Sequence, residues 1–224
     1  AREAKIAPYL DRQKHIELQK LQPPLKPKPI FTDTSPQEVL RWVTEEYLPF
    51  RRWELTVQQA KFHERTSDSL AKSFSEWIYQ QYPQLKITPV VKSLLNYNTT
   101  YRVQTLCQQH PVLWVVVDGL GWLDHKQLLS YLTEGDSQLS VENDLEARFS
   151  ILPTKTEYAK WSLYAQMTPC SSDWSKDIKK AFQTLNIGKY YSDNKLNDLY
   201  KDLKENKYQL YCWDTIELDK CYHN

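Results

Sequence analysis

Glycine is scarce in this sequence, with 4 residues in 224 against a usual share of about 7%. This scarcity excludes collagen-like and glycine-rich linker proteins, and it disfavours β-rich folds that need many tight turns. Long apolar runs are also missing, since none approaches the roughly 18 residues that a transmembrane helix requires. The mean hydropathy is −0.68. We therefore expect no membrane-spanning segment.

Cysteines are few and the charges nearly cancel. The four cysteines stand at positions 107, 170, 212 and 221 without a C-x-x-C pair, which is typical of reduced thiols in a cytoplasmic protein. The 29 Lys and Arg balance 28 Asp and Glu, and a net charge of +1 gives no overall attraction to nucleic acid or anionic lipid. Hydrophobic residues make up 41%, enough for one large domain or two small ones.

Residues 1–32 form a basic, proline-punctuated segment. Seven Lys and Arg against three Asp and Glu give it a net charge of +4. Because proline fixes φ and removes backbone donors, the run Pro23–Pro29 predicts an extended connector. Two interpretations are open, a solvated linker and an arm that binds nucleic acid.

Residues 33–105 have a helical pattern. Ser35 and Glu38 have the spacing of a capping box, and apolar residues recur behind them at intervals of three and four. Pro49 is predicted to end this helix, and a second helical segment is predicted over about 53–82, with a break, until Pro83. We find no catalytic constellation in this region.

Residues 106–224 alternate between strand and helix patterns. The apolar run Val112–Val117 is typical of a central parallel strand buried on both faces. Further strands are predicted at 148–152, 189–191 and 208–213, with helices over 123–132, from 156, over 174–185 and over 196–203. This alternation predicts an α/β fold with a largely parallel sheet.

Polar residues follow the apolar strand runs, at the place where open α/β sheets bind ligands. Asp118 and Gly119 follow the first run, Pro153–Thr156 the second, and Asp214–His223 the last. Asp118 and Thr156 could each simply cap a helix. Thr154 is expected in the bend after Pro153, and Thr156 in the first helical turn. Asp219 and His223 are four residues apart, so on a helix they would face the same way and could share a metal ion.

Together the three motifs resemble the alkaline phosphatase superfamily, and within it the PglZ domain of bacterial phage-defence (BREX-type) proteins. The matching runs within residues 106–224 are VVVDGLGWLD, SILPTKTEYAKWSLYAQMTP and YCWDTIELDKCYH. The resemblance implies a metal-dependent phosphoester hydrolase, of the phosphodiester type, with an alkaline-phosphatase-like sheet. It implies that Asp118 binds the first of two zinc-like divalent ions, that Thr156 is the nucleophile and contacts the same ion, and that Asp219 and His223 bind the second.

The resemblance also implies an incomplete metal site and an incomplete sheet. The superfamily pattern continues with a further Asp-His pair and another His, whereas this sequence begins at Ala1 and stops at Asn224, as a piece of a longer protein would. Gln166 and Tyr222 stand where glycines are usual. We therefore expect weak metal binding and little phosphodiesterase activity. The alternative is a catalytically inactive PglZ-like scaffold or interaction subunit. In either case we expect a cytoplasmic protein whose partners are other phage-defence subunits. The basic arm adds nucleic acid as a further candidate partner.

Overall fold

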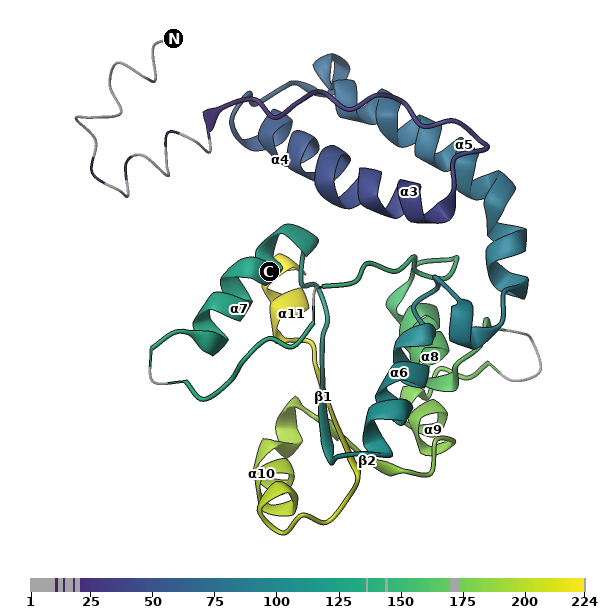
Figure 1. The fold of residues 1–224 in the computed structure, drawn as a ribbon, viewed down its shortest axis with the longest axis vertical. Coiled ribbons are helices and arrows are strands. Elements are labelled where there is room, and N and C mark those ends of the chain that lie inside the picture. The colour runs from purple at the N-terminus through teal and green to yellow at the C-terminus, as the bar shows by residue number, and fades with distance from the viewer. Residues whose placement is uncertain are drawn as a thin grey trace. The chain divides into compact units, whose positions relative to one another are not determined.

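The computed structural model describes residues 11, 14, 18, 21–135, 137–143, 145–169 and 174–223. Contacts divide the chain into two compact units, Ala1–Tyr82 and Pro83–Asn224 (Figure 1). Much of the predicted basic arm lies outside the described residues. None of the described helices combines the length and the apolar character that crossing a bilayer requires.

The first unit begins with a helix that changes its pitch. Its parts are α3 (Pro36–Arg41), the π-helix η2 (Trp42–Tyr47) and α4 (Leu48–Thr56). The predicted capping box is confirmed, because the Ser35 side chain and Glu38 exchange hydrogen bonds. The predicted end at Pro49 is wrong. Since proline has no N–H to donate, the preceding turn widens, with the Leu48 N–H bonded to the Val43 carbonyl, and the helix continues.

The rest of this unit packs on that helix. After η3 (Phe62–Glu64) comes α5 (Thr66–Ile87), which contains Pro83, so the predicted stop at this proline is also wrong. The core cluster is formed by Trp42, Phe50 and Leu70. Residues 23–30 form neither helix nor strand, and the Lys28 carbonyl accepts a hydrogen bond of 2.8 Å from the Trp42 indole.

The second unit is an α/β structure. Its three strands form one all-parallel sheet in the order β1-β3-β2, which confirms the predicted class. The elements in chain order are η4 (Val90–Lys92), α6 (Asn98–Cys107), β1 (Val112–Val117), η5 (Trp122–Asp124), α7 (His125–Thr133), α8 (Thr156–Ala165), α9 (Ile178–Gln183), β2 (Gly188–Ser192), η6 (Asp193–Lys195), α10 (Leu196–Lys204), β3 (Leu210–Thr215) and α11 (Glu217–His223).

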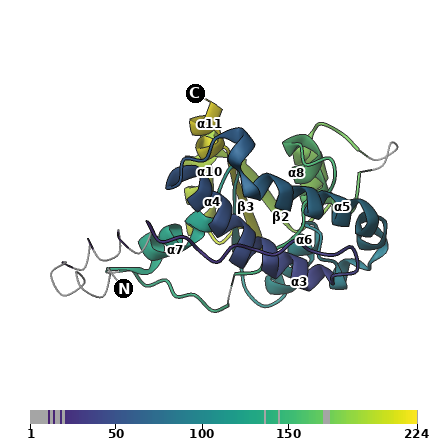
Figure 2. The same ribbon diagram turned by 90° about the horizontal axis from the view of Figure 1, so that it is seen from above.

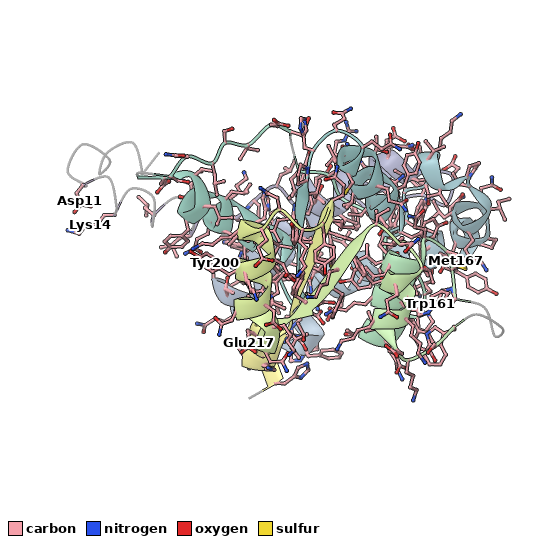
Figure 3. The ribbon with its side chains drawn as sticks, turned by 90° about the horizontal axis from the view of Figure 1, so that it is seen from below. Asp11, Lys14, Trp161, Met167, Tyr200 and Glu217 are labelled. Atoms are coloured by element: carbon pink, nitrogen blue, oxygen red, sulfur yellow. The ribbon has the colours of Figure 1, made fainter. Side chains whose placement is uncertain are left out.

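Helices cover the sheet on both faces. Helices α6, α8 and α9 lie on one side, where Trp114, Tyr164 and Phe182 belong to the larger core cluster (Figure 1). Helix α10 lies on the other side, and there Leu199 packs against two tyrosines of β2 and β3. Trp161 of α8 and Tyr200 of α10 mark these two sides in Figure 3, and Figure 2 shows β2 and β3 between the two helices.

Two predictions about the strands are wrong. Val112–Val117 has the predicted bounds, but β1 is an edge strand and β3 is central. Leu113 and Val115 are 45% and 42% exposed, so β1 is not buried on both faces. Residues 148–152 form no strand; only Phe149 makes an isolated bridge, to Leu95. An apolar run shows that a strand can be buried, and not which neighbours bury it.

Candidate functional site

A cleft of about 690 Å³ opens at the carboxyl ends of the strands. These ends lie at one edge of the sheet, because Val117 pairs with Thr215 and Ser192 with Asp214. The walls come from the first turns of α8 and α11 and from the segments that follow β2 and β3. The polar side chains in the lining are those of Thr156, Lys160, Ser192, Asp193, Asn194, Asp214, Glu217 and Lys220.

Asp118 lies directly after β1, as predicted. Its backbone N–H donates to the Thr215 carbonyl at 2.9 Å, which extends the pairing of β1 with β3 by one residue. Its side chain is 20% exposed, and one carboxylate oxygen lies 3.2 Å from the Lys160 ammonium. The carboxylate therefore stands at the rim of the sheet with one face toward a buried cation.

Gly119 brings α11 against the end of β1. It has φ +82°, a left-handed conformation that glycine adopts without strain. A Cβ at this position would lie 3.0 Å from both Cα and N of Asp219, closer than side chains normally approach a backbone. The predicted turn at Gly119 is confirmed. This close approach places the backbone of Asp219 against Gly119, the residue that follows Asp118.

Thr156 is the first residue of α8 and lines the cleft, so the predicted helix start is confirmed. The N-cap residue Lys155 makes no side-chain capping hydrogen bond. Thr154 is exposed in the preceding turn, outside the helix. Of the two threonines, only Thr156 is a lining residue of this cleft.

Asp219 and His223 share one face of α11, as their spacing predicts. The imidazole Nε2 lies 3.6 Å from a carboxylate oxygen of Asp219. The side chain of His223 is 76% exposed and that of Asp219 is 36% exposed. The pair is therefore open to solvent.

Lys160 is the residue of this edge that the sequence analysis missed. Its ammonium lies 2.6 Å from Asp214 and 3.2 Å from Asp118, and its side chain is only 9% exposed. The second oxygen of Asp214 accepts a hydrogen bond of 2.8 Å from the hydroxyl of Tyr164. Two signals were available: Lys160 follows Thr156 by four residues on one helix, and Asp214 interrupts an apolar strand.

Tyr164 and Cys212, next to the Lys160–Asp214 ion pair, stay protonated at neutral pH. Burial raises the pKa of Tyr164 far above its usual range, and the neighbouring Asp214 adds to the effect. Burial likewise raises the pKa of the Cys212 thiol to about 12. Tyr164 is therefore a permanent donor to Asp214, and the charged groups here are the two carboxylates and Lys160.

Asp193 fixes the far side of the cleft. Burial would raise the pKa of its carboxyl, but hydrogen bonds from the Thr215 hydroxyl, the Ile216 N–H and the Trp213 indole outweigh burial and lower the pKa. Asp193 is therefore ionised at neutral pH and ties the segment after β2 to the turn between β3 and α11.

No protein-family model matches the chain, and no curated protein matches its sequence. The PglZ resemblance thus stays a prediction that rests on the three motifs.

The edge suits a divalent cation in charge and donor chemistry, but not in the number of grouped ligands. The cleft lining holds the three carboxylates of Asp193, Asp214 and Glu217 against the two ammonium groups of Lys160 and Lys220, a surplus of one negative charge. Carboxylates and imidazole are common ligands of zinc and manganese. Within the described part of the chain, however, no three His, Cys, Asp or Glu side chains gather as a metal-binding group.

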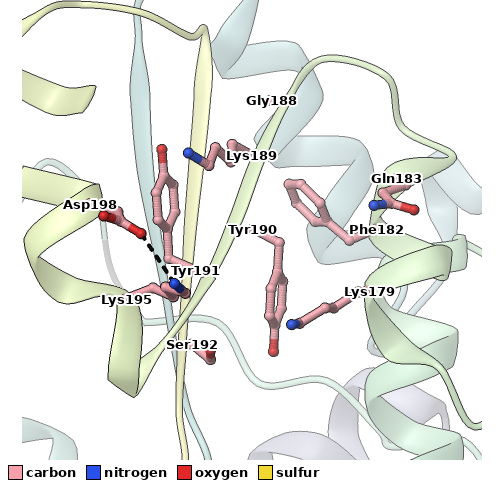
Figure 4. Close-up of a pocket in the computed structure, with 10 residues that line it drawn as sticks. All are labelled: Lys179, Phe182, Gln183, Gly188, Lys189, Tyr190, Tyr191, Ser192, Lys195 and Asp198. Atoms are coloured by element: carbon pink, nitrogen blue, oxygen red, sulfur yellow. Dashed lines mark ion pairs between the residues drawn. The ribbon is translucent and has the colours of Figure 1, made fainter. Parts of the chain in front are cut away.

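A second cavity, of about 430 Å³, lies along β2 (Figure 4). Tyr190 and Tyr191 project to opposite sides of this strand, and Lys195 pairs with Asp198 at 3.5 Å. None of the four predicted site residues lines this cavity. Of the four, Thr156 lines the strand-end cleft, Asp118 contacts its lining residue Lys160, and Asp219 and His223 line neither cavity. The strand-end cleft is therefore the candidate site.

Proposed function

We propose that residues 106–224 form a partial PglZ-like domain of the alkaline phosphatase superfamily, a metal-dependent phosphoester hydrolase that acts within a phage-defence complex. The observation that supports this proposal is a convergence at one sheet edge. Lys160 of α8 contacts Asp118, Thr156 lies one turn before it in the cleft, and Gly119 brings Asp219 alongside. Residues from three distant parts of the sequence meet where parallel sheets bind ligands.

The charge of the cleft supports a requirement for cations. With carboxylates in surplus, a phosphoester would be repelled from this edge unless positive charge is added. Asp118, Asp219 and His223 are the residues that would hold a divalent ion. Such an ion, when bound, supplies positive charge that favours ionisation of a hydroxyl and offsets the charge of the phosphoester.

Thr156 is the hydroxyl in this proposal that attacks phosphorus. It lies at the amino end of the ten-residue helix α8, where the helix dipole favours negative charge on an incoming phosphate. The carboxylate of the next residue, Glu157, would repel a phosphoester. The substrate would therefore approach Thr156 from the cleft side, where Lys160 lies.

The test is hydrolysis of bis(p-nitrophenyl) phosphate by this chain with and without excess Mn²⁺. We expect slow hydrolysis that depends on Mn²⁺, because few ligands are grouped at the edge. Thr156→Ala should abolish it, whereas the matched variant Thr154→Ala should retain it. Activity lost in Thr154→Ala and kept in Thr156→Ala would show that the nucleophile is misassigned.

A non-catalytic scaffold is the second candidate, and one observation favours it. The ammonium of Lys160 already lies against Asp118, where a metal-dependent hydrolase needs a free carboxylate. A scaffold predicts no Mn²⁺-dependent hydrolysis by the wild-type chain at any metal concentration. The same assay therefore separates the two candidates.

A further inference from the structure

Strand β2 forms one edge of the sheet, because it pairs with β3 and with no other strand in the described part of the chain. On the far side of β3, the N–H groups of Val112 and Asp118 donate to the carbonyls of Gln209 and Thr215. Odd-numbered positions along β3 therefore bond β1. Because backbone groups turn to alternate sides along a strand, the even-numbered positions bond β2.

The same alternation identifies the backbone groups of β2 that have no strand beside them. In a parallel pair, a residue that faces its neighbour bonds the two positions that flank its register partner. The even-numbered positions of β3 flank Tyr211 and Trp213, whose register partners are Lys189 and Tyr191. These two residues of β2 therefore face β3. The residues that direct their N–H and C=O groups outward are Gly188, Tyr190 and Ser192.

The cavity of about 430 Å³ is a groove along this open edge (Figure 4). Its lining includes all five residues of β2, together with Phe182 of α9 and Asp198 of α10. Tyr190 and Tyr191 project to opposite sides of the strand, so the groove reaches both faces of the sheet. In the described part of the chain, nothing hydrogen-bonds the outward N–H of Tyr190. An extended chain suits such a groove, because its backbone can pair with the edge while its side chains alternate between the two faces.

The groove carries more lysines than carboxylates. Lys179, Lys189 and Lys195 line it with a single acid, Asp198. Lys195 pairs with Asp198 at 3.5 Å, and Lys189 pairs at 2.7 Å with the buried Asp202, which does not line the groove. Lys179 of α9 has no ionic partner among the described residues, and it lies beside Tyr190 in Figure 4. A carboxylate on an added strand would supply that partner.

The residues of the two edge strands argue against a second copy of this chain as the occupant. Pairing of β2 with the β2 of another copy would bring the same lysines together from both sides, and like charges repel. Pairing with the β1 of another copy would offer no acidic residue, because that strand reads VLWVVV. The occupant that the groove favours is therefore an acidic segment of another protein.

We propose that the open edge of β2 binds an acidic, extended peptide segment of another protein as a fourth strand. The outward N–H and C=O groups pair with the backbone of the segment, and Lys179 pairs with one of its carboxylates. The inference goes beyond the proposed function and does not rest on it, because it needs neither a metal ion nor turnover.

The experiment is a titration of this chain with the capped peptide VEVEVEV, followed by backbone amide NMR signals. We expect the signals of Gly188, Tyr190 and Ser192 to shift most and to saturate, because their N–H groups acquire acceptors. The peptide VKVKVKV should bind at least about tenfold more weakly, since its lysines meet those of the groove. The acidic peptide with every backbone nitrogen methylated should not bind, because it cannot pair as a strand. The absence of a saturable shift, or equal binding of either control peptide, would overturn the proposal.

Variants of the chain test the charged contact and the backbone contact separately. Lys179→Glu should weaken binding of VEVEVEV by about tenfold, whereas Lys180→Glu, on the same helix but outside the groove, should leave it unchanged. Ser192→Pro removes an outward N–H and keeps the pairing with β3, so it should fold and bind the peptide more weakly than the matched Ser192→Ala.

Three results with these variants would each contradict the inference. One is unchanged binding in Lys179→Glu. Another is a Ser192→Pro chain that binds as well as Ser192→Ala, or that is unfolded by circular dichroism while Ser192→Ala is folded. The third is a shift of the same amide signals with protein concentration alone, which would make a second copy of this chain the occupant.

Discussion

Two buried aspartates of the α/β unit are held by the same kinds of group in different proportions. Asp202 of α10 accepts from Lys189 at 2.7 Å, from Lys207 at 3.1 Å and from the Tyr191 hydroxyl at 2.8 Å. Two lysines thus serve two carboxylates, because Lys207 also lies 3.7 Å from Glu205. At the other place, Lys160 and a tyrosine hold Asp214, and the same lysine also reaches Asp118.

The difference in proportion gives the two ends of the sheet different charge. The Asp202 cluster lies near the amino end of β3, where the backbone carbonyl of Asp202 also accepts a hydrogen bond from the Tyr211 hydroxyl. The two carboxylates Asp202 and Glu205 are matched there by Lys189 and Lys207. The Asp214 cluster lies at the carboxyl end and has more carboxylates than lysines. Charge balance therefore favours an added cation at the carboxyl end over the amino end.

The largest expected effect is on stability, and it should differ between the two clusters. Lys160→Met should lower the free energy of unfolding by about 3–5 kcal/mol, because it leaves a buried carboxylate without its cation. Lys189→Met should cost no more than about 1 kcal/mol, because Lys189 is 41% exposed and Lys207 remains on Asp202. Urea unfolding of both variants measures the difference. Equal losses would mean that the two clusters are energetically alike.

A smaller effect is expected in acid, and it belongs to Asp202. Hydrogen bonds from Lys189, and then from Tyr191 and Lys207, lower the pKa of Asp202 far below its usual range. An unfolded Asp has a pKa of about 3.9, so this group stabilises the fold above that pH and the contribution is lost as the pH falls below it. Asp202→Asn should therefore lower the slope of the free energy of unfolding against pH in acid. The variant takes up about one proton fewer on unfolding than the wild type.

The control for this acid effect is Asp198→Asn. Asp198 pairs with Lys195, but its side chain is 56% exposed. In this variant the free energy of unfolding should fall in acid as steeply with pH as in the wild type. A slope unchanged by Asp202→Asn would show that the charged lysines around Asp202 do not stabilise its ionised form.

The local elements of this site were predictable from the sequence, and their partners were not. The bounds of β1, the turn at Gly119 and the start of α8 at Thr156 follow from short-range rules about apolar runs, positive φ and helix starts. The edge position of β1 does not, because it depends on which strands lie beside it. Lys160 was missed for the same reason, since a lysine in a helix is usually solvated and only the packing of α8 against β3 buries this one.

The two prolines teach the same lesson in the first unit. Pro49 and Pro83 are strong local signals for helix ends, yet both lie within helical structure. A π-turn before Pro49 accommodates the missing donor, and Leu70 of α5 packs with Phe50 beside it. Packing over many residues thus outweighed a local cost of about 3 kcal/mol.

The most direct test of the contrast between the two ends of the sheet is paramagnetic broadening of backbone amide signals by Mn²⁺ in the wild-type chain. On β3, Tyr211 of one cluster and Asp214 of the other are three residues apart, or about 10 Å. We predict that the amide signals of Asp118, Thr156 and Asp219 broaden first, at Mn²⁺ concentrations that leave those of Lys189 and Asp202 sharp. Broadening that begins at Asp202, or that spreads evenly over both ends, would contradict the assignment of cation binding to the strand-end cleft.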